Sequence, residues 1–312
     1  MRKRTLLMFF LALLAAASLA AAGEPALALH QVGAGVWAAI SPDGGTAGSN
    51  AGFVIGDDGV AVIDSFINPA AAQELLGEIR KRTNLPVRFV VNTHYHLDHM
   101  AGNGVFAGAG AVVLANENVR EWAHTENLKF FGAGITAEQR AGVEGMVLPS
   151  VVYGQGADLY LGKRKLVVRH LLGHTGSDSI VVVPDANVVF TGDLLWTRHL
   201  PNLIDASTGP WIQTLRTLAT DYPTATFVPG HGEVGGPADL TLFGGYLEAL
   251  RQAVAAALAQ GKFGDSLAAA VNAALAPKYG SWGFFQHFLK PNTLQTAAEL
   301  QGTKRLPGGK TN

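Results

Sequence analysis

The segment Thr93-His94-Tyr95-His96-Leu97-Asp98-His99 follows directly after Val87–Asn92, a mostly apolar run that is typical of a buried strand. Four titratable side chains behind such a strand would be costly to bury without a cation to balance them. The first two histidines stand two positions apart, so an extended loop can direct both at one ion. The aspartate and histidine that follow can face a second ion. The segment therefore predicts a metal-binding loop at the end of a strand.

Three further candidate ligands come later in the chain, each at the end of a predicted strand or in the loop after it. They are His174 in Leu172-Gly173-His174-Thr175-Gly176, Asp193 in Val189-Phe190-Thr191-Gly192-Asp193, and His231 in Pro229-Gly230-His231-Gly232. A glycine next to each ligand removes side-chain bulk and permits unusual backbone angles where segments crowd a metal. The candidate ligands thus come from four separate places in the sequence.

The composition narrows the chemistry of such a centre. The 312 residues include no cysteine, which excludes disulfides and thiolate ligands. Histidine nitrogen and carboxylate oxygen remain, and this donor set suits zinc, iron or manganese. Charged residues make up 15% of the chain and form no basic block, so the sequence gives no support to nucleic-acid binding. We expect a compact protein whose partner is a small-molecule substrate.

The first 22 residues read as a secretory signal peptide. Residues 2–4 are basic, Leu6–Leu14 are apolar, and Ala20-Ala21-Ala22 offers a small-residue cleavage site. We expect export to the periplasm or beyond, with no stable membrane anchor after cleavage; an uncleaved anchor is the alternative. Without the three basic signal residues, the exported chain contains 20 Lys and Arg and 24 Asp and Glu, so it is weakly acidic.

The remaining sequence alternates between strand and helix patterns. Apolar runs between turn residues predict strands at 36–40, 53–55, 60–63, 87–92, 111–114, 158–161, 165–171, 179–183, 188–190 and 226–228. Helical patterns cover 69–82, 116–130, 136–145, 210–219, 237–275 and 293–300. Strands flanked by helices suggest helix–sheet–sheet–helix layers. We expect one domain over 23–312, with a helical C-terminal extension from about 237 to 312.

The order of the candidate ligands resembles that of the metallo-β-lactamase superfamily. The resemblance rests on His94-x-His96-x-Asp98-His99 followed in turn by the three later ligands, and it covers nearly the whole mature chain. It implies a four-layer αββα sandwich with a two-metal site at one sheet edge. His94, His96 and His174 would bind the first metal. Asp98, His99 and His231 would bind the second.

The resemblance also gives roles to two further carboxylates and to the metals. Asp193 would bridge both ions, and Asp64, at the end of the strand 60–63, would orient a ligand histidine through a hydrogen bond. The expected metals are two Zn²⁺ per chain, with iron or manganese possible. A hydroxide held between them would attack an ester, lactone, thioester or amide of a small molecule. Asp98 could also receive a proton during the reaction.

Three other functions remain open at this point. An aspartate at position 193 resembles the bridging ligand of the glyoxalase II and lactonase-like branches. A secreted β-lactamase would nevertheless share most of the ligands. A mononuclear iron dioxygenase of the persulfide type would need only His94, His174 and Asp193. A non-catalytic binding protein could keep the fold, although such proteins generally lose ligands. The sequence leaves the physiological substrate and the oligomeric state open.

Two groups of aromatic side chains have a structural expectation and a functional alternative. Trp122, Phe130 and Phe131 lie on a helix-like segment, where we expect core packing, with lining of the active site as the alternative. His199 follows six residues after Asp193. We expect it on a surface loop, with a place at the substrate entrance as the alternative.

Overall fold

The computed structural model describes residues 27–42 and 44–309, which form two compact units. The predicted signal peptide lies outside the described residues. Unit 1 contains the described chain up to His170 together with Ser179–Phe190, and unit 2 contains Leu171–Asp178 and the chain from Thr191 onward. The prediction of a single domain stays a prediction. No helix in the described part of the chain is long and apolar enough to cross a membrane.

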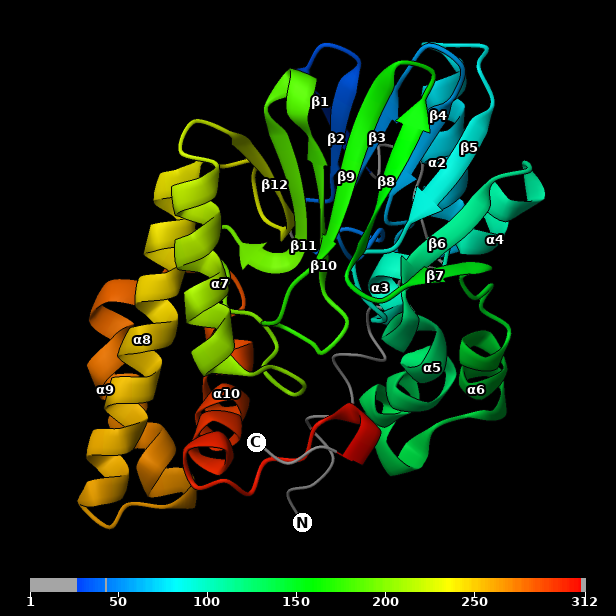
Figure 1. Cartoon of the computed structure of the whole chain (residues 1–312). Coiled ribbons are helices and arrows are strands. Elements are labelled where there is room, and N and C mark those ends of the chain that lie inside the picture. Colours follow the sequence, from blue (N-terminus) through cyan, green and yellow to red (C-terminus); the bar gives the residue numbers. More distant parts are fainter. Residues whose placement is uncertain (1–26, 43, 310–312) are drawn as a thin grey trace. The chain divides into compact units, whose positions relative to one another are not determined.

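Unit 1 contains a seven-stranded sheet in the order β1-β2-β3-β4-β5-β6-β7 (Figure 1). Its strands are β1 Ala28–Gly33, β2 Val36–Ile40, β3 Ala51–Ile55, β4 Val60–Ile63, β5 Val87–Val91, β6 Val112–Asn116 and β7 Val151–Tyr153. The first four strands pair antiparallel, and β4 to β7 pair parallel. The carboxyl ends of β4 and β5 therefore meet at one edge, where Asp64 and the histidine segment begin.

The crossover between β4 and β5 is α2, Pro69–Arg80. Asn68 caps the helix by accepting a hydrogen bond from the amide of Ala71 at 2.9 Å, and Pro69 occupies its first turn as the sequence predicts. The apolar face of α2 packs on the sheet against Phe53, Val62 and other buried side chains. This packing holds β4 and β5 side by side and so fixes where the histidine segment emerges.

A second core in unit 1 lies beneath the histidine segment. It brings together α3 Leu97–Met100, α5 Glu117–Glu126, the 3₁₀ segment η1 Asn127–Gly134 and α6 Ala137–Glu144. Trp122 and Phe131 are buried in this core, as expected. The helix predicted over 116–130 ends earlier, at Glu126, and the 3₁₀ segment η1 follows it.

The remaining strands form a second sheet, in which β11 spans the boundary between the units. Unit 1 holds β8 Gly156–Leu161, β9 Arg164–His170, β10 Ser179–Val183 and the start of β11 Val188–Trp196, paired in that order. Unit 2 holds the rest of β11 and β12 Thr226–His231. The sequence places the end of β11 at Phe190, but the strand continues through the fully buried residues up to Trp196.

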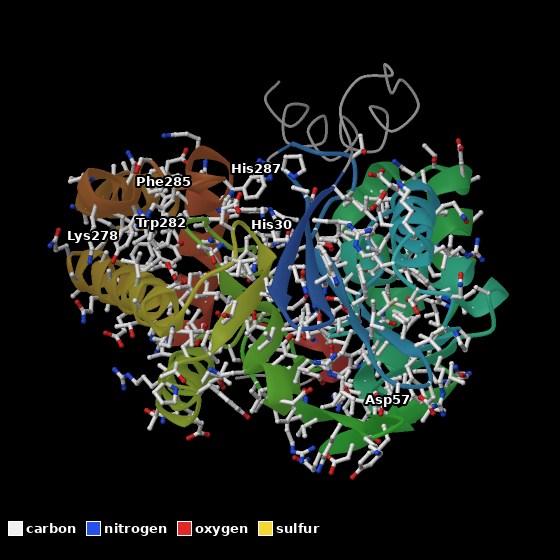
Figure 2. All side chains as sticks on the ribbon, turned by 90° about the horizontal axis from the view of Figure 1, so that it is seen from above. His30, Asp57, Lys278, Trp282, Phe285 and His287 are labelled. Carbon is white, nitrogen blue, oxygen red and sulfur yellow. The ribbon has the colours of Figure 1, made fainter. Side chains whose placement is uncertain are left out.

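The helices of unit 2 are α7 Thr208–Asp221, α8 Pro237–Ala259, α9 Gly264–Tyr279 and α10 Phe285–Leu300. Figure 2 shows Trp282 and Phe285 among these helices and Lys278 at their outer edge. The last helix begins eight residues before the predicted Thr293, and Pro291 lies inside it. Pro291 is one reason why the sequence pattern places the start too late.

The close packing of β3 predicts a strong effect at Gly52. A Cβ at this position would meet the Phe190 ring and the Trp37 carbonyl, and both are fixed by neighbouring strands. We expect Gly52→Ala to lower the free energy of unfolding by about 1–3 kcal/mol in a urea titration. The matched control is Gly77→Ala in α2, whose added Cβ meets nothing within 4 Å. It should instead stabilise the protein by about 0.5–1 kcal/mol. Equal midpoints for the two variants would contradict this packing.

Candidate metal centre

Three predicted ligand histidines form one buried ring cluster in unit 1. The ring centroid of His94 lies 4.7 Å from that of His96 and 4.2 Å from that of His99. The available nitrogen atoms of His94 and His96 lie within 4.8 Å of each other. A carboxylate oxygen of Asp98 and a ring nitrogen of His99 also lie within 4.8 Å of each other. The structure therefore brings together the four predicted ligands of the segment.

Asn127 fixes the backbone of this segment. Its amide group donates to the carbonyl of Tyr95 at 2.7 Å, and its carbonyl oxygen accepts from the amide of Leu97 at 3.0 Å. These bonds hold the two residues on either side of His96. The Phe130 ring stands edge-on against the His96 ring at 5.1 Å, so this half-buried side chain contacts a candidate ligand as well as the core.

Asp64 holds His99 in one orientation. Its carboxylate accepts a hydrogen bond from Nδ1 of His99 at 2.8 Å and two more from the amide and hydroxyl of Thr93 at 2.7 and 2.8 Å. Burial raises the pKa of Asp64, and the nearby His99 opposes that rise. With Nδ1 bound to a carboxylate, His99 is left with Nε2 to offer to a metal. This is the contact expected of Asp64.

Asp64 and Phe66 have backbone angles that non-glycine residues rarely adopt. Their φ values are 58° and 68°, and both side chains are buried. Aspartate tolerates this left-handed region, but a bulky phenylalanine is strained there. The turn after β4 is therefore strained, and in this conformation it directs the Asp64 carboxylate toward the histidine segment.

An amide network beneath α3 was not predicted from the sequence. The side-chain oxygen of Asn103 accepts from Ser65 Oγ and from Asn92 Nδ2, both at 2.9 Å. Asn92 Nδ2 also donates to the carbonyl of His99 at 3.1 Å. The signal that could have revealed the network is Asn92, a polar residue at the end of an otherwise apolar strand.

Unit 2 holds one buried carboxylate between two imidazoles. Nε2 of His174 lies 3.1 Å from one oxygen of Asp193, and Nε2 of His231 lies 3.4 Å from the other oxygen. A Cβ at Gly230 would collide with the Asp193 carboxylate, so only glycine fits beside it. The Asp193 carboxylate therefore offers one oxygen beside each imidazole.

The donor spacing fits zinc. Two donor atoms that bind the same tetrahedral zinc ion, each at about 2.0–2.2 Å, lie roughly 3.4 Å apart. The two nitrogen–oxygen distances at Asp193, 3.1 and 3.4 Å, lie near this separation. The donors are nitrogen and oxygen only, as zinc, iron and manganese accept. The metal-ligand assignments themselves stay predictions.

Other residues around the unit 2 donors were missed by the sequence reasoning. Asp178 accepts from the amide and hydroxyl of Thr175 at 2.8 and 2.6 Å, which braces the loop that carries His174. Burial raises the pKa of Asp178 to about 7, and His174 opposes the rise. Trp196 stacks on the His231 ring with centroids 3.8 Å apart. These contacts restrict the orientation of both imidazoles.

His199 is buried, with 8% of its surface exposed, and does not lie on a surface loop as expected. Its Nδ1 lies 2.7 Å from the carbonyl of Thr197, and its ring fills the space beside Gly283. The short stretch after β11 looks polar in sequence, but it packs under the turn that precedes α10. The expected surface position is therefore wrong.

Comparison with known proteins identifies the family. The model of the metallo-β-lactamase superfamily matches residues 44–231, a stretch that contains every candidate ligand. The chain belongs to the metallo-β-lactamase superfamily. It is 27% identical over 192 residues to a type 2 metallo-β-lactamase of Bacteroides fragilis, which covers 60% of this chain and 70% of that protein. It is 26% identical over 169 residues to a hydroxyacylglutathione hydrolase of Brucella anthropi, covering 54% and 56%.

Solved structures agree on the fold of this superfamily member. A metallo-β-lactamase from Pontibacter korlensis matches with a TM-score of 0.59 and 24% identity, over 71% of this chain and 99% of that one. The predicted fold class, a four-layer αββα sandwich, is confirmed. The matched relatives include both β-lactamases and a hydroxyacylglutathione hydrolase by name, so family membership supports a hydrolase and leaves its substrate open.

The position of Asp64 predicts a measurable effect on metal binding. Asp64→Asn removes the carboxylate that keeps Nδ1 of His99 protonated, so we expect zinc affinity to fall about 10–100-fold in competition with a chromophoric chelator. The matched control is Asp58→Asn, because Asp58 forms an exposed ion pair with Arg88 at 2.6 Å. The control should keep the affinity of the unmodified protein. Undiminished zinc affinity in Asp64→Asn would contradict the orienting role.

Proposed function

We propose that this protein is a dinuclear zinc hydrolase that cleaves an ester, lactone, thioester or amide bond in a small molecule. The observation that carries the proposal is Asp193, whose two carboxylate oxygens each face one imidazole nitrogen, at 3.1 and 3.4 Å. A carboxylate with an imidazole at each oxygen suits a bridge between two ions. Membership of the metallo-β-lactamase superfamily supports the same assignment.

The proposed ligand set uses every donor described above. His94, His96 and His174 would hold one zinc ion, and Asp98, His99 and His231 would hold the other. Asp193 would belong to both. Each set is made of neutral imidazoles and carboxylates, so the negative charges of the buried Asp193 and the partly exposed Asp98 would be balanced by the ions.

Zinc would supply a Lewis acid that polarises a carbonyl group and lowers the pKa of water toward neutrality. The protein's own groups prepare for this chemistry. Asp64 keeps the proton of His99 on Nδ1, and the Trp196 stack restrains the His231 ring. Asp98 Oδ2 lies 3.7 Å from Nε2 of His99, and 24% of the Asp98 side chain is exposed. Asp98 is therefore the carboxylate that we propose accepts a proton on the solvent side.

The cations of the C-terminal helices favour a substrate other than a glutathione thioester. Arg251 pairs with Glu299 at 2.8 Å and Lys290 pairs with Asp265 at 2.5 Å, while Lys278 lies over the Tyr279 ring. These helices thus commit three of their basic side chains to neighbours in the same unit. We propose a substrate without the carboxylates of glutathione, although a hydroxyacylglutathione hydrolase is among the relatives.

We also propose that the protein acts outside the cytoplasm. The support is the basic, apolar and small-residue order of residues 1–22. Fractionation of cells that express the full chain tests this directly. A product shortened by about 22 residues in the periplasmic or secreted fraction is the expected result. A full-length product that sediments with membranes would indicate an uncleaved anchor.

Metal content tests the dinuclear assignment. We expect about two zinc ions per chain by elemental analysis, and loss of ester or lactone hydrolysis after chelation, because both ions are needed to position and activate the reactants. His94→Ala and His231→Ala should each retain about one ion, since each removes a ligand from a different set. His30→Ala, an exposed histidine on β1, is the matched control and should retain two. Two ions in His231→Ala would require other ligands for the second site.

The same preparation separates the alternative reactions. Turnover of nitrocefin at a rate well above that of esters and lactones would favour a β-lactamase, the activity named for the Bacteroides fragilis relative. A single iron per chain, with oxygen uptake on glutathione persulfide and no hydrolysis, would favour the dioxygenase. That outcome would leave Asp98, His99 and His231 without a metal role, which the intact set of donors argues against.

A further inference from the structure

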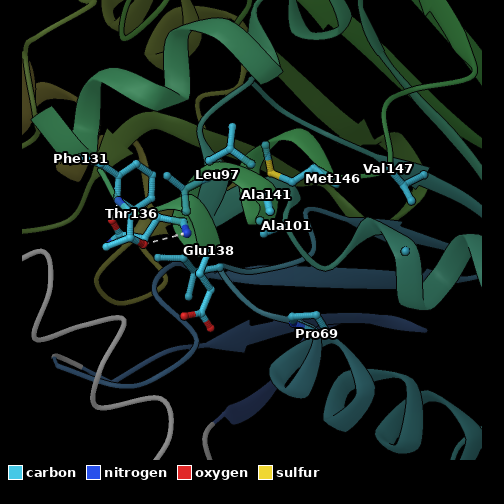
Figure 3. A pocket seen from close by; sticks show the side chains of 15 residues that line it. Pro69, Leu97, Ala101, Phe131, Thr136, Glu138, Ala141, Met146 and Val147 are labelled. Atoms are coloured by element: carbon cyan, nitrogen blue, oxygen red, sulfur yellow. Dashed lines mark hydrogen bonds between the residues drawn. The ribbon is translucent and has the colours of Figure 1, made fainter. Parts of the chain in front are cut away.

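A cavity of about 760 Å³ lies in unit 1 beside the helix that carries Asp98 and His99. Figure 3 shows Leu97, Phe131 and Met146 around it, with Glu138 among the lining groups. A volume of this size is within the range of pockets that hold drug-sized molecules. Most of its wall is apolar, so water inside it is readily displaced by an apolar group.

Small residues on α6 and at its C-cap leave room on one side of the cavity. Ala141, Gly142 and Gly145 line it beside Glu138, while Gln139 and Val143 line it from the same segment. A Cβ at Gly142 would meet nothing within 4 Å, so the space in front of the helix is open. A glycine inside a helix costs about 1 kcal/mol relative to alanine. The sequence thus accepts a weaker helix here, and the cavity remains unfilled.

One charged side chain lines the cavity. Glu138 is the only ionic group among the lining residues, and within the described part of the chain no hydrogen bond or ion pair engages its carboxylate. An anion brought into this space would be repelled, and a cation would be attracted. The negative charge of Glu138 therefore favours an apolar ligand with a cationic end over one with an anionic end.

The cavity adjoins the candidate metal centre through α3 and the turn after β4. Leu97 and Ala101, which line it, lie on either side of Asp98 along the helix. Ile67 also lines it, and Gly48 is fitted between Ile67 and Asp98: a Cβ on Gly48 would lie 2.9 Å from Ile67 and 3.4 Å from Asp98. An apolar group in the cavity would thus contact residues that flank Asp98 in the sequence.

From these observations we infer that the cavity is a subsite for a substrate with an extended apolar group and a cationic rather than anionic end. This inference rests on the proposed hydrolase function and names the substrate class for it. The apolar group would fill the space in front of Gly142. The cationic end would face Glu138. The reacting bond would then be held on the Asp98 side of α3.

Direct binding tests the cavity without any hydrolysis. Isothermal titration calorimetry with decyltrimethylammonium and decyl sulfate, both below their micelle concentrations, compares one apolar chain with opposite charges. We expect the cation to bind about fivefold more tightly, and Glu138→Gln to remove most of that difference. Glu144→Gln is the matched control, because Glu144 lies on the same helix but pairs with Arg140 and does not line the cavity. Equal binding of both probes, or tighter binding of decyl sulfate, would overturn the charge selection.

A cavity-filling variant tests the location. Gly142→Leu places a side chain in the open space and should weaken decyltrimethylammonium at least about tenfold. Gly77→Leu in α2 is the matched control, since a Cβ there also meets nothing within 4 Å and lies away from the cavity. It should bind like the unmodified protein. Undiminished binding by Gly142→Leu, with a thermal transition showing that it is folded, would place the probe elsewhere.

Hydrolysis then tests whether the cavity serves the substrate. The ratio of kcat/KM for p-nitrophenyl decanoate to that for p-nitrophenyl acetate should fall about tenfold in Gly142→Leu, through KM for the long ester. Decyltrimethylammonium should compete with the decanoate. Binding of the probe without competition would overturn the subsite. Absence of all ester hydrolysis would count against the proposed reaction on these esters, while calorimetry would still decide whether the cavity binds the probe.

Discussion

The hydrogen bond between the Asp64 carboxylate and His99 is the contact on which the unit 1 half of the site depends. It joins the end of β4 to the segment after β5, two strands that α2 holds parallel and adjacent. A buried carboxylate is unfavourable alone, and burial accordingly raises its pKa. Three donated hydrogen bonds offset that penalty, and each of them comes from the histidine segment. The same bonds that stabilise the charge therefore set the orientation of the donors.

The unit 2 donors meet the same physical problem with a different solution. Asp193 is as buried as Asp64, and its two oxygens lie 3.1 and 3.4 Å from the imidazole nitrogens of His174 and His231. Its position depends on Gly230, since any side chain there would displace the carboxylate. Aromatic rings support the imidazoles: Trp211 stands edge-on to His174 at 5.4 Å, and Trp196 stacks on His231. Asp64 is thus held by hydrogen bonds from the histidine segment, whereas each oxygen of Asp193 lies beside an imidazole that an aromatic ring supports.

The sequence predicts the parts of this protein that local chemistry specifies. The spacing of His94 and His96, the proline and asparagine at the start of α2, and the strand before the histidine segment are all visible in a few neighbouring residues. Asn103 and Trp196 are not, because each acts through partners that only the fold brings close. Asp178 bonds to Thr175 only three residues away, but its burial is not visible in the sequence. The sequence predicts too short a β11, because Gly192 and Asp193 are poor strand residues in isolation and are held in the strand by burial. His199 shows the converse error, since a polar neighbourhood in sequence gives no sign that the turn before α10 packs against it.

The segment from Asn127 to Val147 contacts both the histidine segment and the cavity of unit 1. Its first residue binds the backbone on both sides of His96, and later residues, among them Phe131 and Met146, line the cavity. Leu97 takes part in both, with its amide held by Asn127 and its side chain on the cavity wall. Side chains packed this closely move little without moving their neighbours. A group that fills the cavity would therefore contact the same residues that hold the backbone of the donors. The fit of a substrate and the geometry of the proposed zinc site thus depend on one set of side chains.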